Sequence, residues 1–339
     1  MASLTLAALF TCEISAQTTY DDFSGTAIDS SRWFQFGSTA RLTMSGGKLR
    51  IAGATTQDAL GIFAIDGLRG DFELVVDYDS FAASASNGDP GLSMSAFDAF
   101  GPPFSGGELG LGLIETSSGR EFVAEGYRNN VFLGGNQTPT TSSAGQLRLV
   151  RTGNTGIASF RASGQANWTV LATIPNLFAS TTVHFIIETV GVTGRADFAL
   201  DQVTYTGTRV AGSPLYGSRC LDWGATALGF PVVGNADFSL VADGGQSFAN
   251  APAFVVLGAQ QTAIDLSAIR APGCWLLAST NVVFAAPPAD PFGLCEITMP
   301  IPNANNLVGG TLFFQVLAAT TQNALGVAAS NGVRVVMTR

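Results

Sequence analysis

Two aspartates, Asp77 and Asp79, have the spacing in this sequence that best suits acid–base chemistry. The segment 71–79 alternates acidic with apolar residues, which is typical of a half-buried strand. Two positions along a strand span about 6.6 Å, so both carboxyl groups would lie on one face. Cleavage of a glycosidic bond requires two carboxyl groups about 5–9.5 Å apart. The pair is therefore a candidate catalytic site, with a solvated edge or a calcium-facing patch as the alternative.

The chain has one histidine, His184, which limits the other chemistries that it could perform. The sequence contains no G-x-S-x-G elbow, no H-E-x-x-H pair, no Walker loop and no G-x-G-x-x-G. A serine hydrolase would have to build its triad on His184. Because this residue lies in an apolar and β-branched run, 182–187, we expect a packed or hydrogen-bonded histidine within a sheet.

A second group of residues has the types that bind sugars. Glu125 and Tyr127 share one face of a strand, and Arg128 and Asn129 stand at its end. A sugar site needs an aromatic surface with polar groups beside it. These four residues are the candidate ligand contacts, and an ordinary exposed hairpin is the alternative. Three phenylalanines in the segment 97–104 are further aromatic candidates.

The elements that must position these residues are strands. No segment has a 3.6-residue period, whereas alternating or β-branched runs bounded by Gly, Asn, Asp and Ser recur along the chain. The clearest candidates after 71–79 are 48–52, 146–151, 157–162, 183–190 and 198–206. We expect an all-β protein whose large aromatic residues fill the space between packed sheets, namely Phe23, Trp33, Trp168 and Phe198.

Length and composition limit the number of domains and the classes of partner that this chain could have. The 339 residues are enough for two domains, each with its own core. We place a domain at 17–207, a Gly- and Pro-containing linker at 208–218 and a second domain at 219–339. Only 12% of residues are charged and the net charge is −9. Nucleic acid is excluded as a partner, because phosphate binding needs clustered Lys and Arg.

The N-terminal segment and the cysteines indicate export. Residues 1–16 contain a short apolar run followed by small residues, which predicts a secretory signal; a buried first strand is the alternative. No later run is long enough to span a membrane. Three cysteines remain after cleavage, and a Cys220–Cys274 disulfide is favoured over Cys274–Cys295. Cys295 alternates with apolar residues, as a buried free thiol would.

Residues 20–207 resemble concanavalin A-like jelly rolls, a superfamily that includes laminin-G-like lectin modules and some glucanases. The matching segments are 21–25 (DDFSG), 28–33 (IDSSRW), 70–74 (GDFEL), 168–171 (WTVL) and 198–203 (FALDQV). The resemblance implies a two-sheet antiparallel sandwich with one concave face. It also implies one calcium ion near the chain ends, held by Asp21, Asp22 and Asp201, with oxygen ligands as calcium prefers.

Glucanases of that superfamily carry a Glu-x-Asp-x-x-Glu strand, of which the segment 107–115 (GELGLGLIE) keeps only the end carboxylates. Glu108 and Glu115 are seven residues apart, about 23 Å along a strand, and face opposite sides. They cannot form a catalytic pair.

Residues 216–339 resemble a domain found at the ends of secreted planctomycete-type bacterial proteins. The matching segments are 228–238 (LGFPVVGNADF), 250–258 (NAPAFVVLG), 271–274 (APGC) and 300–303 (PIPN). The resemblance implies a smaller β-sandwich accessory module. Its nearly uncharged surface favours docking to cell-surface material or to another chain.

Together these features predict a secreted, non-catalytic protein of two β-sandwiches. The first would bind extracellular glycan, with calcium as the expected cofactor, and the second would attach or self-associate. A structural matrix or surface-layer component is the alternative. A divergent glycoside hydrolase using Asp77 and Asp79 is the third hypothesis.

Overall fold

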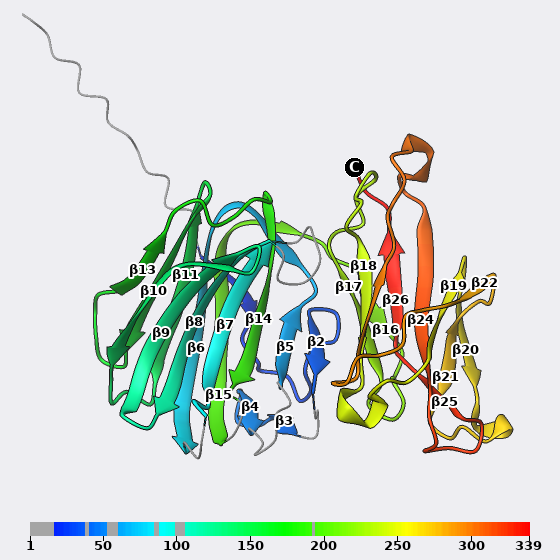
Figure 1. Cartoon of the computed structure of the whole chain (residues 1–339), viewed down its shortest axis with the longest axis horizontal. Helices are drawn as coiled ribbons and strands as arrows, with labels where there is room; N and C mark the ends of the chain where they lie inside the picture. The colour runs from blue at the N-terminus through cyan, green and yellow to red at the C-terminus, as the bar shows by residue number, and fades with distance from the viewer. Residues whose placement is uncertain (1–16, 38–40, 53–59, 85–87, 99–105, 192–193) are drawn as a thin grey trace, which may run out of the picture.

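The computed structural model describes residues 17–37, 41–52, 60–84, 88–98, 106–191 and 194–339. The predicted signal segment, Phe100 and Phe104 lie outside them. The described residues form strands and short 3₁₀ turns, without an α-helix, and none of their segments is a helix able to cross a membrane. Figure 1 shows two layered β bodies, one built up to β15 and one from β16 onward. The all-β fold class with two sandwiches is confirmed.

The first body is a two-layered sandwich. Its strands are β1 (Thr18–Asp21), β2 (Trp33–Phe36), β3 (Leu42–Met44), β4 (Leu49–Ala52), β5 (Gly61–Ala64), β6 (Gly67–Ser84), β7 (Gly91–Asp98), β8 (Gly107–Thr116), β9 (Gly119–Arg128), β10 (Val131–Pro139), β11 (Gly145–Thr152), β12 (Thr155–Ala162), β13 (Thr169–Ile174), β14 (Thr182–Val190) and β15 (Arg195–Val210). Each strand expected from the sequence is among them. All of the strand pairs are antiparallel.

Two layers can be followed through the pairing. Sheet 1 has the order β10-β9-β8-β7-β14-β5-β2. Sheet 2 has the order β13-β12-β11-β6-β15-β4-β3, with β1 also on β15. The layers join where the start of β6 pairs with the start of β14, through Arg69 and Thr182. Alternation along most of the strands turns one apolar face inward, and these inner faces form one large core, to which the edge strand β10 contributes no residue.

The aromatic core differs from the expectation at one position. Phe23, Trp33 and Phe198 are buried in the core, as predicted. Trp168 is not a core residue, and that expectation was wrong. It precedes β13 and is only half-buried, between the guanidinium groups of Arg148 and Arg161. Cation–π contact on the outer face of sheet 2 replaces burial between the sheets.

The second body is smaller. Its strands are β16 (Leu215–Tyr216), β17 (Gly224–Leu228), β18 (Ser239–Asp243), β19 (Ala253–Gly258), β20 (Gln261–Asp265), β21 (Trp275–Ala278), β22 (Val282–Ala285), β23 (Leu294–Thr298), β24 (Thr311–Ala319), β25 (Val327–Ala329) and β26 (Gly332–Val336). A sheet of order β16-β26-β24-β19-β22 packs with a three-stranded sheet, β17-β18-β23, around a second core. β25 adds to β24, and β20 pairs with β21.

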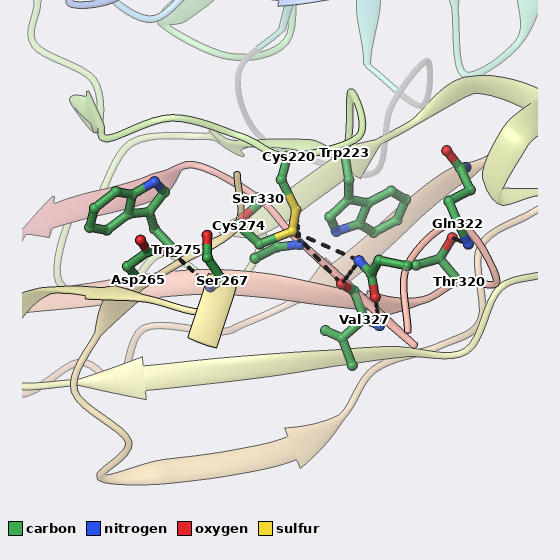
Figure 2. Close-up of a disulfide and its surroundings, with 12 residues drawn as sticks. Cys220, Trp223, Asp265, Ser267, Cys274, Trp275, Thr320, Gln322, Val327 and Ser330 are labelled. Carbon is green, nitrogen blue, oxygen red and sulfur yellow. Dashed lines mark hydrogen bonds between the residues drawn. A yellow bond between two sulfur atoms is a disulfide. The ribbon is translucent and has the colours of Figure 1, made fainter. Parts of the chain in front are cut away.

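Cys220 and Cys274 form the disulfide that the sequence favoured, closing a separation of 54 residues. Figure 2 shows this disulfide with the indole of Trp223 among its surroundings. All three residues belong to the second core, and the Trp223 indole N–H donates to the carbonyl oxygen of Val316 at 3.0 Å. Cys295 is a free, buried thiol, as expected, and burial raises its pKa to about 11.

The two bodies share an apolar contact. Phe34, Phe63 and Ile65 of the first body form a buried cluster against which Leu215 and Leu228 of the second pack. Backbone polar groups are satisfied across the same contact: Arg219 Nη1 donates to the Gln35 carbonyl oxygen at 3.0 Å. The second body therefore covers the outer side of β2 and β5, which decides how much of sheet 1 is open.

Candidate functional site

The outer face of sheet 1 is half covered and half open. Across the strands, one row of opposed residues runs from Phe63 in β5 through Ile186, Ser95 and Gly110 to Glu125 in β9. Residues opposite each other in antiparallel strands have side chains on the same face. Phe63 is buried at the junction with the second body, whereas Glu125 is exposed. The open half therefore lies over β7, β8, β9 and β10.

His184 marks the covered end of this face. It is buried in β14, opposite Phe97 of β7, and its ring stacks on Phe230 of the second body with centroids 4.7 Å apart. The backbone N–H of Gly229 donates to His184 Nε2 at 3.2 Å. Burial lowers the pKa of the imidazole to about 4. The packed, hydrogen-bonded histidine predicted from the sequence is confirmed, with the bond coming from the other body.

A cleft of about 240 Å³ occupies the open half. Gly110 and Gly112 of β8 lie in its floor, where a glycine within a strand leaves room above the backbone. An added Cβ at Gly112 would stand 2.9 Å from the carbonyl oxygen of Leu92. The lining is completed by Asp89, Ser93, Ser95, Leu111, Ile114, Val123, Glu125, Tyr127 and Val190. Below, this space is called the sheet 1 cleft.

An aromatic pair stands at the rim of the sheet 1 cleft. Tyr127 of β9 is opposite Phe132 of β10, and their rings meet edge to face with centroids 5.4 Å apart. Phe132 is 55% exposed, although it is large and apolar. The Tyr127 hydroxyl donates to Glu125 Oε2 at 2.9 Å. The rim thus combines an exposed apolar ring surface with a positioned carboxylate.

Two further carboxyl groups face the same side of sheet 1. Glu108 of β8 lies opposite Tyr127, and Glu188 of β14 lies opposite Ser93. Burial is the main cause that raises the pKa of Glu108, and the negative charge of Glu125 raises it further. A hydrogen bond with the Ser95 hydroxyl acts in the opposite direction and lowers the pKa. Burial, with the charge of Glu108 in addition, raises the pKa of Glu188 to about 7.

The structure brings together two of the four candidate ligand contacts. Glu125 and Tyr127 both line the sheet 1 cleft. Arg128 alternates to the other side of β9, where its guanidinium donates to the carbonyl oxygen of Asn176 at 2.8 Å. Asn129 lies in the turn between β9 and β10, in the left-handed region with φ of 52°.

Asp77 and Asp79 lie on sheet 2, in a different depression of about 370 Å³. Asp79 is paired with Lys48, carboxylate to ammonium at 2.9 Å, and this hydrogen bond lowers its pKa. Burial raises the pKa of Asp77, against a hydrogen bond from the amide of Gln146. This sheet 2 groove is polar, with Lys48 and Arg161 among its lining residues.

The three aspartates expected around calcium have different neighbours. Asp21 is buried, and its two carboxylate oxygens accept the backbone N–H of Phe23 at 2.8 Å and the Trp33 indole N–H at 2.7 Å. Asp22 is exposed, and Asp201 lies 3.8 Å from the Lys48 ammonium. Among the described residues, no three His, Cys, Asp or Glu side chains are grouped to hold a metal ion. These residues do not fit a shared ion, and calcium binding stays a prediction.

Sequence reasoning missed Phe132 and the relation of Glu108 to Glu125. An apolar run next to two glycines, 131–135, was the available signal for an exposed aromatic residue at the sheet edge. Glu108 was compared with Glu115 along its own strand, whereas its neighbour lies across the β8–β9 ladder. Glu125 is opposite Gly110, so Glu108 and Glu125 are diagonal neighbours, with about 7–8 Å between such positions.

No known protein family and no curated protein matches this chain by sequence. Solved structures do resemble it over part of its length. They include Bacteroides ovatus xyloglucan PUL GH43B, with 13% identity, 56% of this chain covered and a TM-score of 0.43; the chain spans 39% of that protein. The κ-carrageenase of Pseudoalteromonas carrageenovora, solved with a κ-carrageenan oligotetrasaccharide, is 11% identical over 61% of this chain and all of that one (TM-score 0.42). A legume lectin-like domain from Entamoeba histolytica is 9% identical over 52% and 90% (TM-score 0.40). Function is therefore argued from the cleft itself.

Proposed function

We propose that the chain is an extracellular carbohydrate-binding protein and that the sheet 1 cleft is its binding site. The observation that carries this proposal is the exposed Phe132 ring beside Tyr127 and the carboxylate of Glu125. A sugar ring presents apolar C–H groups on its faces and hydroxyl groups on its edge. An aromatic surface with a few positioned polar groups is the arrangement that binds such a ligand.

The lining supports the same conclusion. Ser93 and Ser95 supply hydroxyl groups along the cleft, while Gly110 and Gly112 leave its floor without side chains. The described residues leave the cleft open rather than enclosed. An open cleft suits a segment of a polysaccharide chain better than a small isolated sugar. The Cys220–Cys274 disulfide supports an oxidising compartment, in keeping with export. The attachment role and bacterial accessory-domain resemblance of the second body stay predictions.

A glycan array probed with the full chain tests the proposal. Saturable binding should weaken about tenfold or more when Tyr127 and Phe132 are both replaced by alanine, because the ring surface is lost. Phe292→Ala is the matched control, since Phe292 is a 61% exposed aromatic residue of the second body. Absence of binding across the array, or equal loss in the control variant, would contradict a carbohydrate site in this cleft.

Glycoside hydrolysis is the second candidate function, and Glu108 favours it. A half-buried carboxyl with a raised pKa next to an exposed carboxylate is the arrangement of a general acid and its partner. The backbone positions of such diagonal neighbours are about 7–8 Å apart, which allows their carboxyl groups to reach the separation of about 5–9.5 Å that glycosidic cleavage requires. Release of reducing ends from a polysaccharide panel would establish it. Loss in Glu108→Gln would place the reaction in the sheet 1 cleft, whereas loss in Asp77→Asn would place it in the sheet 2 groove.

A further inference from the structure

The sheet 1 cleft has no basic side chain. The chain has 16 Lys and Arg residues, all of which lie in the described part, and none of them lines the cleft. Strand alternation explains this for the nearest ones, because Arg120 and Arg128 of β9 project to the side opposite Glu125. Arg120 pairs there with Glu115 at 3.1 Å, and Arg128 donates to the Asn176 carbonyl oxygen.

Acidic groups, by contrast, are spread along the whole face. Asp89 and Glu125 line the cleft, while Glu108 and Glu188 lie on the same side of neighbouring strands. The raised pKa values of Glu108 and Glu188 have burial as their main cause, with the charge of a neighbouring glutamate added. A cationic ligand would relieve that repulsion, and an anionic ligand would increase it.

We infer that the sheet 1 cleft selects carbohydrates by charge, binding amino sugars with free amino groups in preference to neutral sugars and excluding polyuronates. The inference rests on the proposed carbohydrate-binding function. In this inference the cleft with its aromatic rim is the binding site, and the carboxyl groups determine only which carbohydrates bind there. Because no three acidic groups of the described residues converge on one point, the arrangement suits charges distributed along a polymer rather than one metal ion.

Three hexasaccharides compared by calorimetry test this inference: glucosamine, N-acetylglucosamine and galacturonate hexamers. The first two differ only in the acetyl groups that remove the charge. At pH 6, where such amines are protonated, the glucosamine hexamer should bind about tenfold more tightly than its acetylated counterpart through Asp89 and Glu125, which line the cleft. Glu188, whose pKa is about 7, is largely neutral at this pH. The galacturonate hexamer should not bind. Glu125→Gln should weaken binding of the glucosamine hexamer about fivefold more than it weakens binding of the neutral hexamer, because only the charged ligand also loses an ionic attraction.

Asp265→Asn is the matched control, because it removes one exposed carboxylate of the second body and changes the net charge equally. Equal affinity for the charged and acetylated hexamers would overturn the inference and leave the proposed function standing. Equal weakening in Asp265→Asn would also overturn it, since the effect would then be one of net charge. If the protein binds none of the three hexamers but does bind glycans on the array, only the inference about charge selection is refuted. If it also binds no glycan on the array, the proposed carbohydrate-binding function is refuted as well.

Discussion

The rings of His184 and Phe230 stack with their centroids 4.7 Å apart and their planes 14° apart, and they belong to different β bodies. The only histidine of the chain is thus a contact between its two halves. Gly229, the neighbour of Phe230, donates its backbone N–H to His184 Nε2. This bond requires a neutral imidazole, because a protonated ring has no acceptor atom. The junction that limits the sheet 1 cleft on one side therefore depends on a titratable group.

We expect His184 to make the free energy of unfolding decrease as the pH falls. Its pKa is about 4 in the folded chain and about 6.5 when unfolded, so between these values the unfolded state binds one more proton. This residue should add about 3 kcal/mol to the free energy of unfolding above pH 6.5, lost as pH falls to 4. Chemical denaturation of wild type and His184→Gln across this range measures it. A stability difference between them that does not vary with pH would contradict the prediction.

Glu188 should have the opposite pH dependence. Its folded pKa of about 7 exceeds the ordinary value of 4.5, so between these values the folded state binds more protons. Wild-type stability relative to Glu188→Gln should therefore fall by up to about 3 kcal/mol as pH rises from 4.5 to 7. Because the effects of His184 and Glu188 oppose each other, the wild-type profile should be flatter than that of either variant. Parallel profiles for wild type and Glu188→Gln would refute this.

Gly67 should tolerate no side chain, because it lies against the same junction. A Cβ at this position would stand 2.2 Å from Phe230 Cζ and 2.6 Å from the carbonyl oxygen of Val183. Gly67→Ala should cost about 1–3 kcal/mol of unfolding free energy through overpacking. Combining it with Phe230→Ala should give a loss smaller than the sum of the two, since the larger clash is removed. Additive losses would show that Phe230 does not limit the space at Gly67.

The Cys220–Cys274 disulfide should stabilise the second body substantially. Its sequence separation of 54 residues corresponds to about 4 kcal/mol in the chain-entropy estimate. Replacing both cysteines by alanine should lower the unfolding free energy by an amount of that order and leave the thermal transition of the first body less affected. Cys295→Ala is the control for loss of a buried sulfur without loss of a cross-link. A double variant as stable as the control would contradict the estimate.

The strands, their faces and the buried free thiol could be predicted from the sequence because each depends on local pattern or on residue type. The sequence favoured the Cys220–Cys274 disulfide over Cys274–Cys295, but the pairing itself is decided by the tertiary structure. Alternation over 71–79 identified the strand β6 and its acidic side, and the apolar run around Cys295 identified a buried thiol. Trp168 shows the limit of this reasoning. From its residue type alone, a large aromatic residue is predicted to be buried in a core. The cation–π contacts of Trp168 arise instead because the pairing of β11 with β12 places Arg148 and Arg161 close to its ring.

The residues of the candidate site are brought together by strand pairing, which cannot be read from their spacing along the sequence. Glu108 and Glu125 are 17 positions apart in the sequence and become diagonal neighbours only through the register of β8 with β9. Tyr127 meets Phe132 through the β9–β10 hairpin, and the second body covers one half of sheet 1 and leaves the other open. Sequence by itself determined that this is a chain of strands with apolar inner faces, since strand alternation is a local property. Only the tertiary structure decided which outer face holds the cleft, because strand order, register and domain contact bring together residues that are far apart in the chain.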